Sequence, residues 1–268
     1  MTAYGSAQAQ AQGETETRMA LESIDRHHQE MLKNAEAWHQ KPALRAIYKT
    51  FHQAIARHLA PLPHPTVELG SGVADIQRVI PGCIRTDIFP NPWIDQVENG
   101  YALSFSPGSL SNLVLFDVFH HLRYPGTAFK EFNRVLAPGG RVILFEPCVS
   151  LLGLLVYGAL HPEPLALNQP IQWHAPSGWD PSKIDYYAAQ GNASRLFLKF
   201  SIQQDLSGFR VITTQRYAAV SYVASGGYSK PQMYPTAWLP LMTAIDRLCD
   251  RLPHIFATRL LVVLEKAT

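Results

Sequence analysis

The chain has 268 residues, of which 47% are hydrophobic and 16% charged, and its formal net charge is +2. This size and apolar content suffice for one large domain that carries an inserted segment. The small net charge, with Lys and Arg dispersed along the chain, argues against a nucleic-acid partner. The three cysteines lie far apart and form no Cys-x-x-Cys pair, so we expect no metal site and a reducing, cytoplasmic location.

The N-terminal region divides into a polar stretch and a helical stretch. Residues 1–18 are rich in Ala, Gln, Gly, Thr and Glu and predict a mobile tail without the apolar core of a signal peptide. Residues 19–62 predict a helical cap, because apolar residues recur at helical spacing on both sides of Pro42. Tyr48, in the second of these helices, is a candidate contact for a ligand. No apolar run along the chain is long enough to span a membrane.

The stretch 66–76 predicts a buried strand, Val67 to Leu69, followed by a glycine turn and a short helix over about 74–80. Glycine tolerates positive φ and lets a ligand approach the backbone closely. The start of the helix offers free N–H groups to a polar ligand. A short Gly-x-Gly is a weak signal by itself, but acidic residues follow at the ends of strands, where they can bind amine or ribose groups.

Short apolar segments and helical segments then alternate along the chain. Strands are expected over about 83–88, 113–116 and 141–145, and a helix over about 125–135 ends before Pro138-Gly139-Gly140. This alternation predicts a mostly parallel sheet with helices on both faces. Strands over about 209–223 and 259–264, with a helix over about 240–252 between them, predict an antiparallel hairpin at the end of the chain.

Five segments between Thr66 and Pro147, in the correct order, resemble the motifs of class I S-adenosylmethionine-dependent methyltransferases, in particular the small-molecule type similar to the ubiquinone-biosynthesis group. The segments are Val67-Glu68-Leu69-Gly70-Ser71-Gly72-Val73-Ala74, Asp87 at a strand end, Asn99-Gly100-Tyr101-Ala102-Leu103-Ser104-Phe105, Asp117-Val118-Phe119-His120-His121-Leu122, and Phe132-Asn133-Arg134-Val135-Leu136-Ala137-Pro138-Gly139-Gly140. The resemblance implies a Rossmann-like, seven-stranded, mostly parallel α/β sheet with helices on both faces, an N-terminal helical cap and an inserted lid. Residues 63–268 would form the methyltransferase domain.

The resemblance also implies which residues bind S-adenosylmethionine. Asp87 takes the place of the ribose-binding acid, Asn99 and Gly100 lie near adenine, and Asp117 lies near the methionine amine. Ala74 replaces the family's third glycine, and Asn99 replaces its usual acid, although the amide oxygen of Asn99 still accepts a hydrogen bond. The expected cofactor-binding residues are Glu68, Gly70, Ser71, Gly72, Asp87, Ile88, Asn99, Gly100, Tyr101, Asp117 and Val118.

His120 and His121 follow a strand end, where ligands bind in open α/β sheets. One hypothesis is that either imidazole takes a proton from an acceptor hydroxyl group. The other is that both histidines shape the loop and contact the cofactor or the lid. Transfer of a methyl group from a sulfonium requires little beyond alignment and the exclusion of water.

Residues 148–204 have no counterpart in the motifs and are too long for a simple connection, so we expect an inserted lid that selects the acceptor. Its apolar run, 151–160, predicts a buried lid helix or a surface that touches lipid, and hints at an apolar or lipid-like acceptor. Candidate acceptor-binding residues are Tyr48, Trp173, Trp179, Tyr186 and Tyr187.

The sequence therefore predicts an enzyme that transfers a methyl group from S-adenosylmethionine to a small-molecule acceptor. Two alternatives stay open. The chain could be a non-catalytic S-adenosylmethionine-binding scaffold for a partner. A nicotinamide-dependent oxidoreductase is disfavoured, because Asp75 occupies the position of the third glycine in Gly-x-Gly-x-x-Gly.

Overall fold

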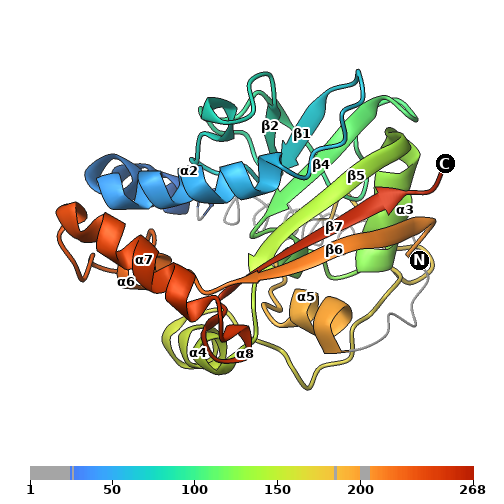
Figure 1. Ribbon diagram of the computed structural model, residues 1–268. Helices are drawn as coiled ribbons and strands as arrows, with labels where there is room; N and C mark the ends of the chain where they lie inside the picture. Colours follow the sequence, from blue (N-terminus) through green and yellow to red (C-terminus); the bar gives the residue numbers. More distant parts are fainter. Residues whose placement is uncertain (1–24, 26, 184–185, 200–205) are drawn as a thin grey trace, which may run out of the picture.

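The computed structural model describes residues 25, 27–183, 186–199 and 206–268. A seven-stranded sheet forms its centre, with the strand order β3-β2-β1-β4-β5-β7-β6 (Figure 1). Strands β1 to β5 pair in parallel, whereas β7 runs antiparallel to both β5 and β6. The strands are β1 (Thr66–Leu69), β2 (Ile84–Asp87), β3 (Gln96–Val97), β4 (Leu110–Phe116), β5 (Leu136–Pro147), β6 (Phe209–Tyr217) and β7 (Arg259–Lys266). The predicted Rossmann-like fold and its terminal antiparallel hairpin are confirmed.

Helices cover both faces of this sheet. The bounds of the helices and helical turns are α2 (Pro42–Ala56), η1 (Ile76–Arg78), η2 (Phe119–His121), α3 (Pro125–Val135), α4 (Leu151–Leu155), η3 (Val156–Leu160), α5 (Asn192–Ser194), η4 (Arg195–Lys199), α6 (Val220–Ala224), η5 (Thr236–Trp238), α7 (Leu239–Cys249) and α8 (Pro253–Phe256). Residues 27–40 are also helical and precede α2.

The alternation of side chains along β4 explains why the core has two halves. Leu113 and Leu115 pack with α3, through residues such as Phe129, on one face of the sheet. Val114 and Phe116 pack with α2 on the other face. Successive side chains of a strand point to opposite faces of the sheet. All seven residues of β4 are buried, so this strand is covered on both faces.

The predicted helical cap over 19–62 is seen as the helical residues 27–40 and α2, while the predicted tail, 1–18, lies outside the described residues. Helix α2 does more than cover the fold, because its buried face supplies Leu44, Ile47, Phe51 and Ile55 to the core on one face of the sheet. The cap is therefore continuous with the domain that it covers.

Several predicted elements differ in extent. Strand β4 begins at Leu110 rather than at 113, and β5 begins at Leu136 rather than at 141, so that β5 includes Pro138-Gly139-Gly140. The helix expected over about 74–80 is one turn, η1, because Pro81-Gly82 ends it before a longer helix can form. Strand β6 ends at Tyr217, and Ala219 takes a left-handed conformation with φ 47°. The helix expected over about 240–252 is α7, which ends earlier, at Cys249, and a separate short helix, α8, begins at Pro253.

The segment between β5 and β6 begins with α4 and η3, continues through a largely irregular stretch, and ends in α5 and η4. The apolar run 151–160 forms α4 and η3, and α4 lies beside α8 (Figure 1). Four of its leucines are exposed, so the expectation of a buried lid helix is wrong for this run. Among the described residues, no helix combines the length and apolarity that crossing a bilayer requires.

Candidate functional site

The glycine turn follows β1 at the carboxyl edge of the sheet. Gly70 has φ +66° and Gly72 has φ +54°, both in the left-handed region that favours glycine. A Cβ atom on Gly70 would lie 2.4 Å from Cγ2 of Val118, which follows β4. Glycine at position 70 is therefore required by the backbone conformation and by the packing of the neighbouring strand end, before any ligand is considered.

Ser71 and Glu68 join this turn to β2. The Ser71 N–H donates to the Thr86 carbonyl at 2.8 Å, and the Thr86 N–H donates to Ser71 Oγ at 3.2 Å. Glu68 is 2% exposed, and its Oε2 atom has no hydrogen-bond partner among the described residues. Burial raises the pKa of the Glu68 carboxyl to about 8. Glu68 is thus a buried acid with an oxygen that a bound ligand can satisfy.

Asp87 ends β2 and is 5% exposed. Its Oδ1 accepts from the N–H of the half-buried Ile88 at 2.7 Å. Its Oδ2 lies 3.6 Å from Nε2 of His27, on the helix that covers the turn. Burial would lower the pKa of His27, but hydrogen bonding to Asp87 and its charge raise it. The Asp87 carboxylate therefore faces the cap helix at the edge where the ribose is expected.

Asn99 holds a distant segment against this edge. Its Oδ1 accepts from the Tyr101 N–H at 3.0 Å, and its Nδ2 donates to the Pro181 carbonyl at 2.7 Å. The ring of Trp179 meets that of Tyr101 edge-on, at 4.9 Å between centroids. The amide oxygen of Asn99, expected to accept from adenine, accepts instead from the Tyr101 N–H, so Asn99 helps to position Tyr101 and the segment with Trp179 and Pro181. Gly100 lies beside Leu69, Leu122 and Phe132.

Asp117 is the first residue after β4 and has φ 55°, an uncommon conformation for a residue other than glycine. Its carboxylate forms an ion pair with Arg259, whose side chain is 2% exposed. The Arg259 guanidinium lies over the rings of Phe51, Phe116, Phe145 and Tyr222, with the shortest distance, 4.4 Å, to Tyr222. The acid expected near the methionine amine therefore already has a cationic partner.

Glu146, near the end of β5, organises the loop after β4. Its Oε1 accepts from the N–H groups of Val118 and Phe119, and its Oε2 lies 2.6 Å from Nδ1 of His120. Burial would lower the pKa of His120, but the charge of Glu146, and hydrogen bonds to Glu146 and Glu163, raise it to about 10. Glu146 thus fixes both the backbone and the imidazole at this position.

Glu163, in the irregular segment after η3, approaches both histidines. Its Oε2 lies 3.5 Å from Nε2 of His120, and its Oε1 lies 3.8 Å from Nε2 of His121. His121 Nδ1 bonds to the Tyr187 carbonyl at 2.8 Å. Sequence reasoning identified the two histidines but missed Glu146, Glu163 and Arg259. Glu146 was visible as an acid after a strand, whereas no local pattern marks the other two.

The five candidate acceptor-binding residues are not gathered in one place. Trp173 is buried in the core, 5.9 Å from Phe129 between ring centroids, and Trp179 lies against Tyr101. Tyr186 is exposed and donates its hydroxyl to Glu163, beside Tyr187. Tyr48 stacks on Phe116 at 5.0 Å on the opposite face of the sheet from Trp173.

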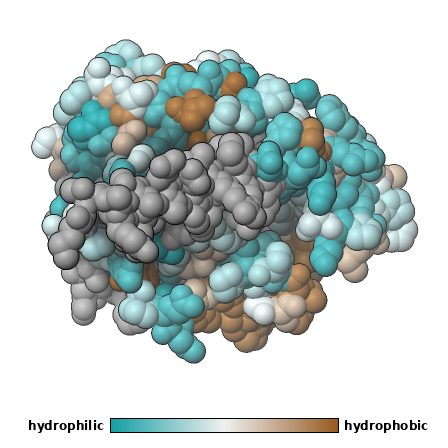
Figure 2. Space-filling model, turned by 180° about the vertical axis from the view of Figure 1, so that it is seen from behind, coloured by the Kyte–Doolittle hydropathy of each residue, from teal (hydrophilic) through white to brown (hydrophobic). Residues whose placement is uncertain are grey.

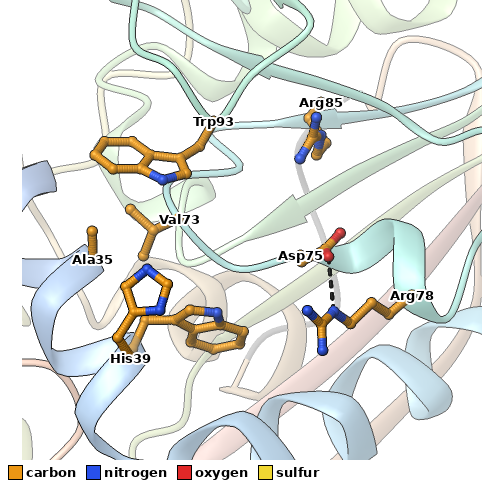
Figure 3. Close-up of a pocket in the computed structure, with 8 residues that line it drawn as sticks. Ala35, His39, Val73, Asp75, Arg78, Arg85 and Trp93 are labelled. Atoms are coloured by element: carbon orange, nitrogen blue, oxygen red, sulfur yellow. Dashed lines mark hydrogen bonds and ion pairs between the residues drawn. The ribbon is translucent and has the colours of Figure 1, made fainter.

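A pocket opens beside the glycine turn, between the cap helix and the β2–β3 connection (Figure 3). Trp93, Val73, Ala35 and His39 lie on one side in this view, and Arg85 and the Asp75–Arg78 pair lie on the other. None of the predicted site residues lines it. The residues around it are Ala35, Trp38, His39, Val73, Asp75, Arg78, Arg85 and Trp93.

The donor set at the carboxyl edge fits S-adenosylmethionine in its chemistry. The cofactor carries an amine, a sulfonium and ribose hydroxyl groups, for which Asp87 offers carboxylate oxygens and Glu68 a buried carboxyl group beside a glycine turn. On the cap helix, Met31 Sδ lies 3.9 Å from the position that a Cβ on Gly72 would take. The cap helix therefore covers the turn at which the cofactor is expected.

Comparisons with known proteins give one family match. Residues 84–144 match the family described as a methyltransferase domain. A search of curated proteins found no match.

Among solved structures, geranyl diphosphate methyltransferase in complex with S-adenosylmethionine is 11% identical, with a TM-score of 0.47, covering 82% of this chain and 85% of that chain. Geranyl diphosphate C-methyltransferase from Streptomyces coelicolor A3(2) is 12% identical, with a TM-score of 0.46 and coverage of 81% and 77%. An S-adenosylmethionine-dependent methyltransferase from Mesorhizobium loti is 15% identical, with a TM-score of 0.43 and coverage of 80% and 96%. The strand order described above, rather than these likenesses, shows the fold.

Proposed function

We propose that the chain transfers the methyl group of S-adenosylmethionine to a small-molecule acceptor, as the motifs predict and as the match of residues 84–144 to a methyltransferase domain supports. One observation carries this proposal. Glu68 lies on β1, Asp87 ends β2 and Asp117 follows β4, so neighbouring parallel strands bring three acidic side chains and the glycine turn to one edge. Ligands of open α/β sheets bind at this edge.

Each proposed contact follows from a side chain's surroundings. Asp87 binds the ribose hydroxyl groups, since its Oδ2 has only long contacts, to His27 and Asn91. Glu68 accepts from the amine or from a hydroxyl group through its unpartnered Oε2. Gly70, Ser71 and Gly72 pass beneath the cofactor, and Ile88, Gly100, Tyr101 and Val118 surround the adenosine. Asp117 acts together with Arg259 and is not a free carboxylate.

The methyl transfer itself needs alignment of the acceptor with the sulfonium and exclusion of water. When bound, S-adenosylmethionine supplies the electrophilic methyl group. The cap helix, through His27 and Met31, covers the turn, while Trp179 and Tyr101 form an aromatic wall near the adenosine. We propose that these residues exclude water from the reacting groups. The general-base role considered for His120 and His121 is not required by this account, because both Nε2 atoms face Glu163.

We further propose an apolar or lipid-like acceptor, drawn from a membrane surface that the chain contacts peripherally. Apolar side chains gather at the lower edge of Figure 2, where α4 lies, and Leu151, Leu154, Leu155 and Leu160 are exposed. The adjoining α7 and α8 bury no residue. Exposed apolar patches of this kind accompany membrane or protein contacts.

The charges beside this apolar surface favour an anionic membrane. Arg247, Arg251 and Asp250 are exposed, and Asp250 accepts a hydrogen bond from the Ala218 N–H. Asp246 is only half-buried and accepts hydrogen bonds from Ser221. The surface therefore presents leucines with arginines at their border.

Vesicle binding tests this contact. We expect cosedimentation with vesicles that contain phosphatidylglycerol, and at least a fivefold loss of bound protein for the double variant L151E/L155E. Leu32→Glu, at another exposed apolar position, is the matched control. Equal binding of both variants would show that this surface does not contact the membrane.

Calorimetric titration separates the functional alternatives. S-adenosylmethionine should bind and NADH should not, and the reverse would favour a nicotinamide-dependent oxidoreductase. Binding of S-adenosylmethionine without transfer to any acceptor would favour a scaffold for a partner. The three free cysteines support the predicted cytoplasmic location, because reducing compartments keep thiols unpaired.

A further inference from the structure

Three metal-ligating side chains converge where the segment after η3 meets the loop after β4. They are His120, His121 and Glu163, and one donor atom from each lies within 4.8 Å of the other two. The two carboxylate oxygens of Glu163 each approach one histidine: Oε2 lies 3.5 Å from Nε2 of His120, and Oε1 lies 3.8 Å from Nε2 of His121. A cation held at about 2.0–2.2 Å from each donor in tetrahedral geometry would separate them by roughly 3.4 Å.

The hydrogen bonds behind the two histidines determine which nitrogen faces the centre of the cluster. Nδ1 of His121 lies 2.8 Å from the Tyr187 carbonyl, which only accepts, so Nδ1 carries the hydrogen and Nε2 carries the lone pair. Nδ1 of His120 likewise bonds to the Glu146 carboxylate at 2.6 Å. Histidines that bind metals are oriented in this way, with the outer nitrogen donating to a carboxylate or a carbonyl.

Glu163 is also held from behind. Tyr186 Oη donates to its Oε1 at 2.7 Å, and Gln190 Nε2 donates to its Oε2 at 2.7 Å. Gln190 is 2% exposed, and its other amide atom, Oε1, is buried without a partner among the described residues. This oxygen is an acceptor on the same amide group whose nitrogen donates to Glu163.

We infer that His120, His121 and Glu163 form a binding site for a divalent cation of the zinc type, with Nε2, Nε2 and a carboxylate oxygen as ligands. Two imidazoles and one carboxylate are the protein ligands of catalytic zinc sites and leave a coordination position open. The side chains of His121 and Glu163 are 35% and 20% exposed, which gives the cation a route of entry. Binding requires neutral imidazoles, so any proton on His120 is released to solvent.

The place of the cluster suggests its use. His120 and His121 follow Asp117 at the end of β4, beside the strand that leads into the glycine turn. An open position on the cation would take an oxygen of the acceptor and hold it near the cofactor edge. This use rests on the proposed methyl transfer, whereas the cation site itself does not.

The test measures cation binding directly, on the full chain after treatment with EDTA. We expect one equivalent of Co²⁺ per chain, seen by its visible absorption and by elemental analysis, and its displacement by Zn²⁺. The variants Glu163→Gln and His121→Ala should each weaken Co²⁺ binding by at least about tenfold, the lower end of losses seen even when only a ligand's supporting group is removed. His64→Ala, at an exposed histidine elsewhere, should bind as the wild type does.

Two results would overturn the inference. One is a wild-type chain that binds no more Co²⁺ than the double variant H121A/E163Q. The other is unchanged absorption of bound Co²⁺ in that variant, which would place the cation elsewhere. Glu163→Gln keeps the size of the side chain, so thermal unfolding of that variant checks that the fold is intact. Titration of the metal-free chain with S-adenosylmethionine, run in parallel, reports separately on the proposed function.

Discussion

The Asp117 carboxylate is ion-paired with the Arg259 guanidinium, and this pair ties the carboxyl end of β4 to the first residue of β7. β7 lies beyond β5 in the sheet, so the pair spans the strand between them. A lone buried arginine is costly, and aromatic rings together with one carboxylate compensate for its lost hydration. The C-terminal hairpin is thereby fixed to the edge at which the cofactor is expected.

Removing one member of this pair should destabilise the fold. We expect Arg259→Met to lower the free energy of unfolding by roughly 1–3 kcal/mol, since Asp117 loses its partner but, with 31% of its side chain exposed, keeps part of its hydration. Urea denaturation measures this change. Arg251→Met, at an exposed arginine, is the control and should change stability by less than about 0.5 kcal/mol. The double variant D117N/R259M should lose less than the sum of its single variants, and strict additivity would deny the coupling.

If Asp87 binds the ribose, replacing it should weaken the binding of S-adenosylmethionine, whereas replacing a nearby acid should not. Asp87→Ala should weaken S-adenosylmethionine binding by roughly 1.5–3 kcal/mol, because a charge-assisted hydrogen bond to hydroxyl groups is removed. Asp95→Ala is the matched control, since Asp95 bonds to Arg85 near the start of β3 and away from the strand end. Calorimetry measures both, and wild-type affinity in the Asp87 variant would refute the assignment.

The contact between Gly70 and Val118 changes what a substitution in the turn should do. Gly70→Ala should cost roughly 1–3 kcal/mol of stability even without cofactor, because its Cβ would lie 2.4 Å from Val118 Cγ2 at a positive φ. The double variant G70A/V118A should regain part of this loss, since the nearest clashing atom is gone. If Val118→Ala fails to rescue thermal stability, the left-handed backbone alone demands the glycine.

Glu68 predicts how stability depends on pH. Its pKa in the folded chain is raised from 4.5 to about 8, so the folded state binds more protons than the unfolded state between these values. The free energy of unfolding should therefore fall as the pH rises from about 5 to 8. Glu68→Gln removes this slope, which denaturant titrations at several pH values would reveal. Parallel pH profiles for the two proteins would mean that Glu68 is ionised throughout.

The two tryptophans of the inserted segment should behave differently, contrary to the expectation that both contact the acceptor. Trp173 packs on Phe129, and its indole fills the space that a Cβ on Gly126 would need, so Trp173→Ala should cost roughly 3–5 kcal/mol of stability. Trp179 lies on Tyr101, so Trp179→Ala should mainly weaken S-adenosylmethionine binding. Melting temperatures and calorimetry separate these effects, and a stable Trp173 variant would contradict the packing argument.

The sequence predicted an element correctly where the residues that mark its start and end lie next to it in the chain. Helix α3 begins and ends where predicted because a proline opens it and Pro138-Gly139-Gly140 follows it closely. The strand end that carries Asp117 was predicted for the same reason, since the apolar run of β4 stops there. The exposure of the run 151–160 could not be predicted, because an apolar helix reads alike whether a neighbour covers it or not.

The side-chain pairs of the site could not be predicted from the sequence. Asp117 and Arg259 are 142 residues apart in the chain, and nothing near either residue identifies the other. Glu163 likewise cannot be identified from its neighbours in the sequence, because only the fold brings the segment after η3 next to His120 and His121. The hydrogen bond from Asn99 to the Pro181 carbonyl is a third such contact, between residues far apart in the chain.

Transfer of a labelled methyl group tests the central claim most directly. The full chain is incubated with cell extract and S-adenosylmethionine carrying a ¹³C-labelled methyl group, and small molecules and lipids are analysed by mass spectrometry. The account predicts a labelled product of low molecular mass with the wild-type chain, at least about tenfold less with Asp87→Ala at limiting cofactor, and an undiminished amount with Asp95→Ala. Equal labelling with the wild-type chain and without added protein, despite tight binding of S-adenosylmethionine, would contradict it.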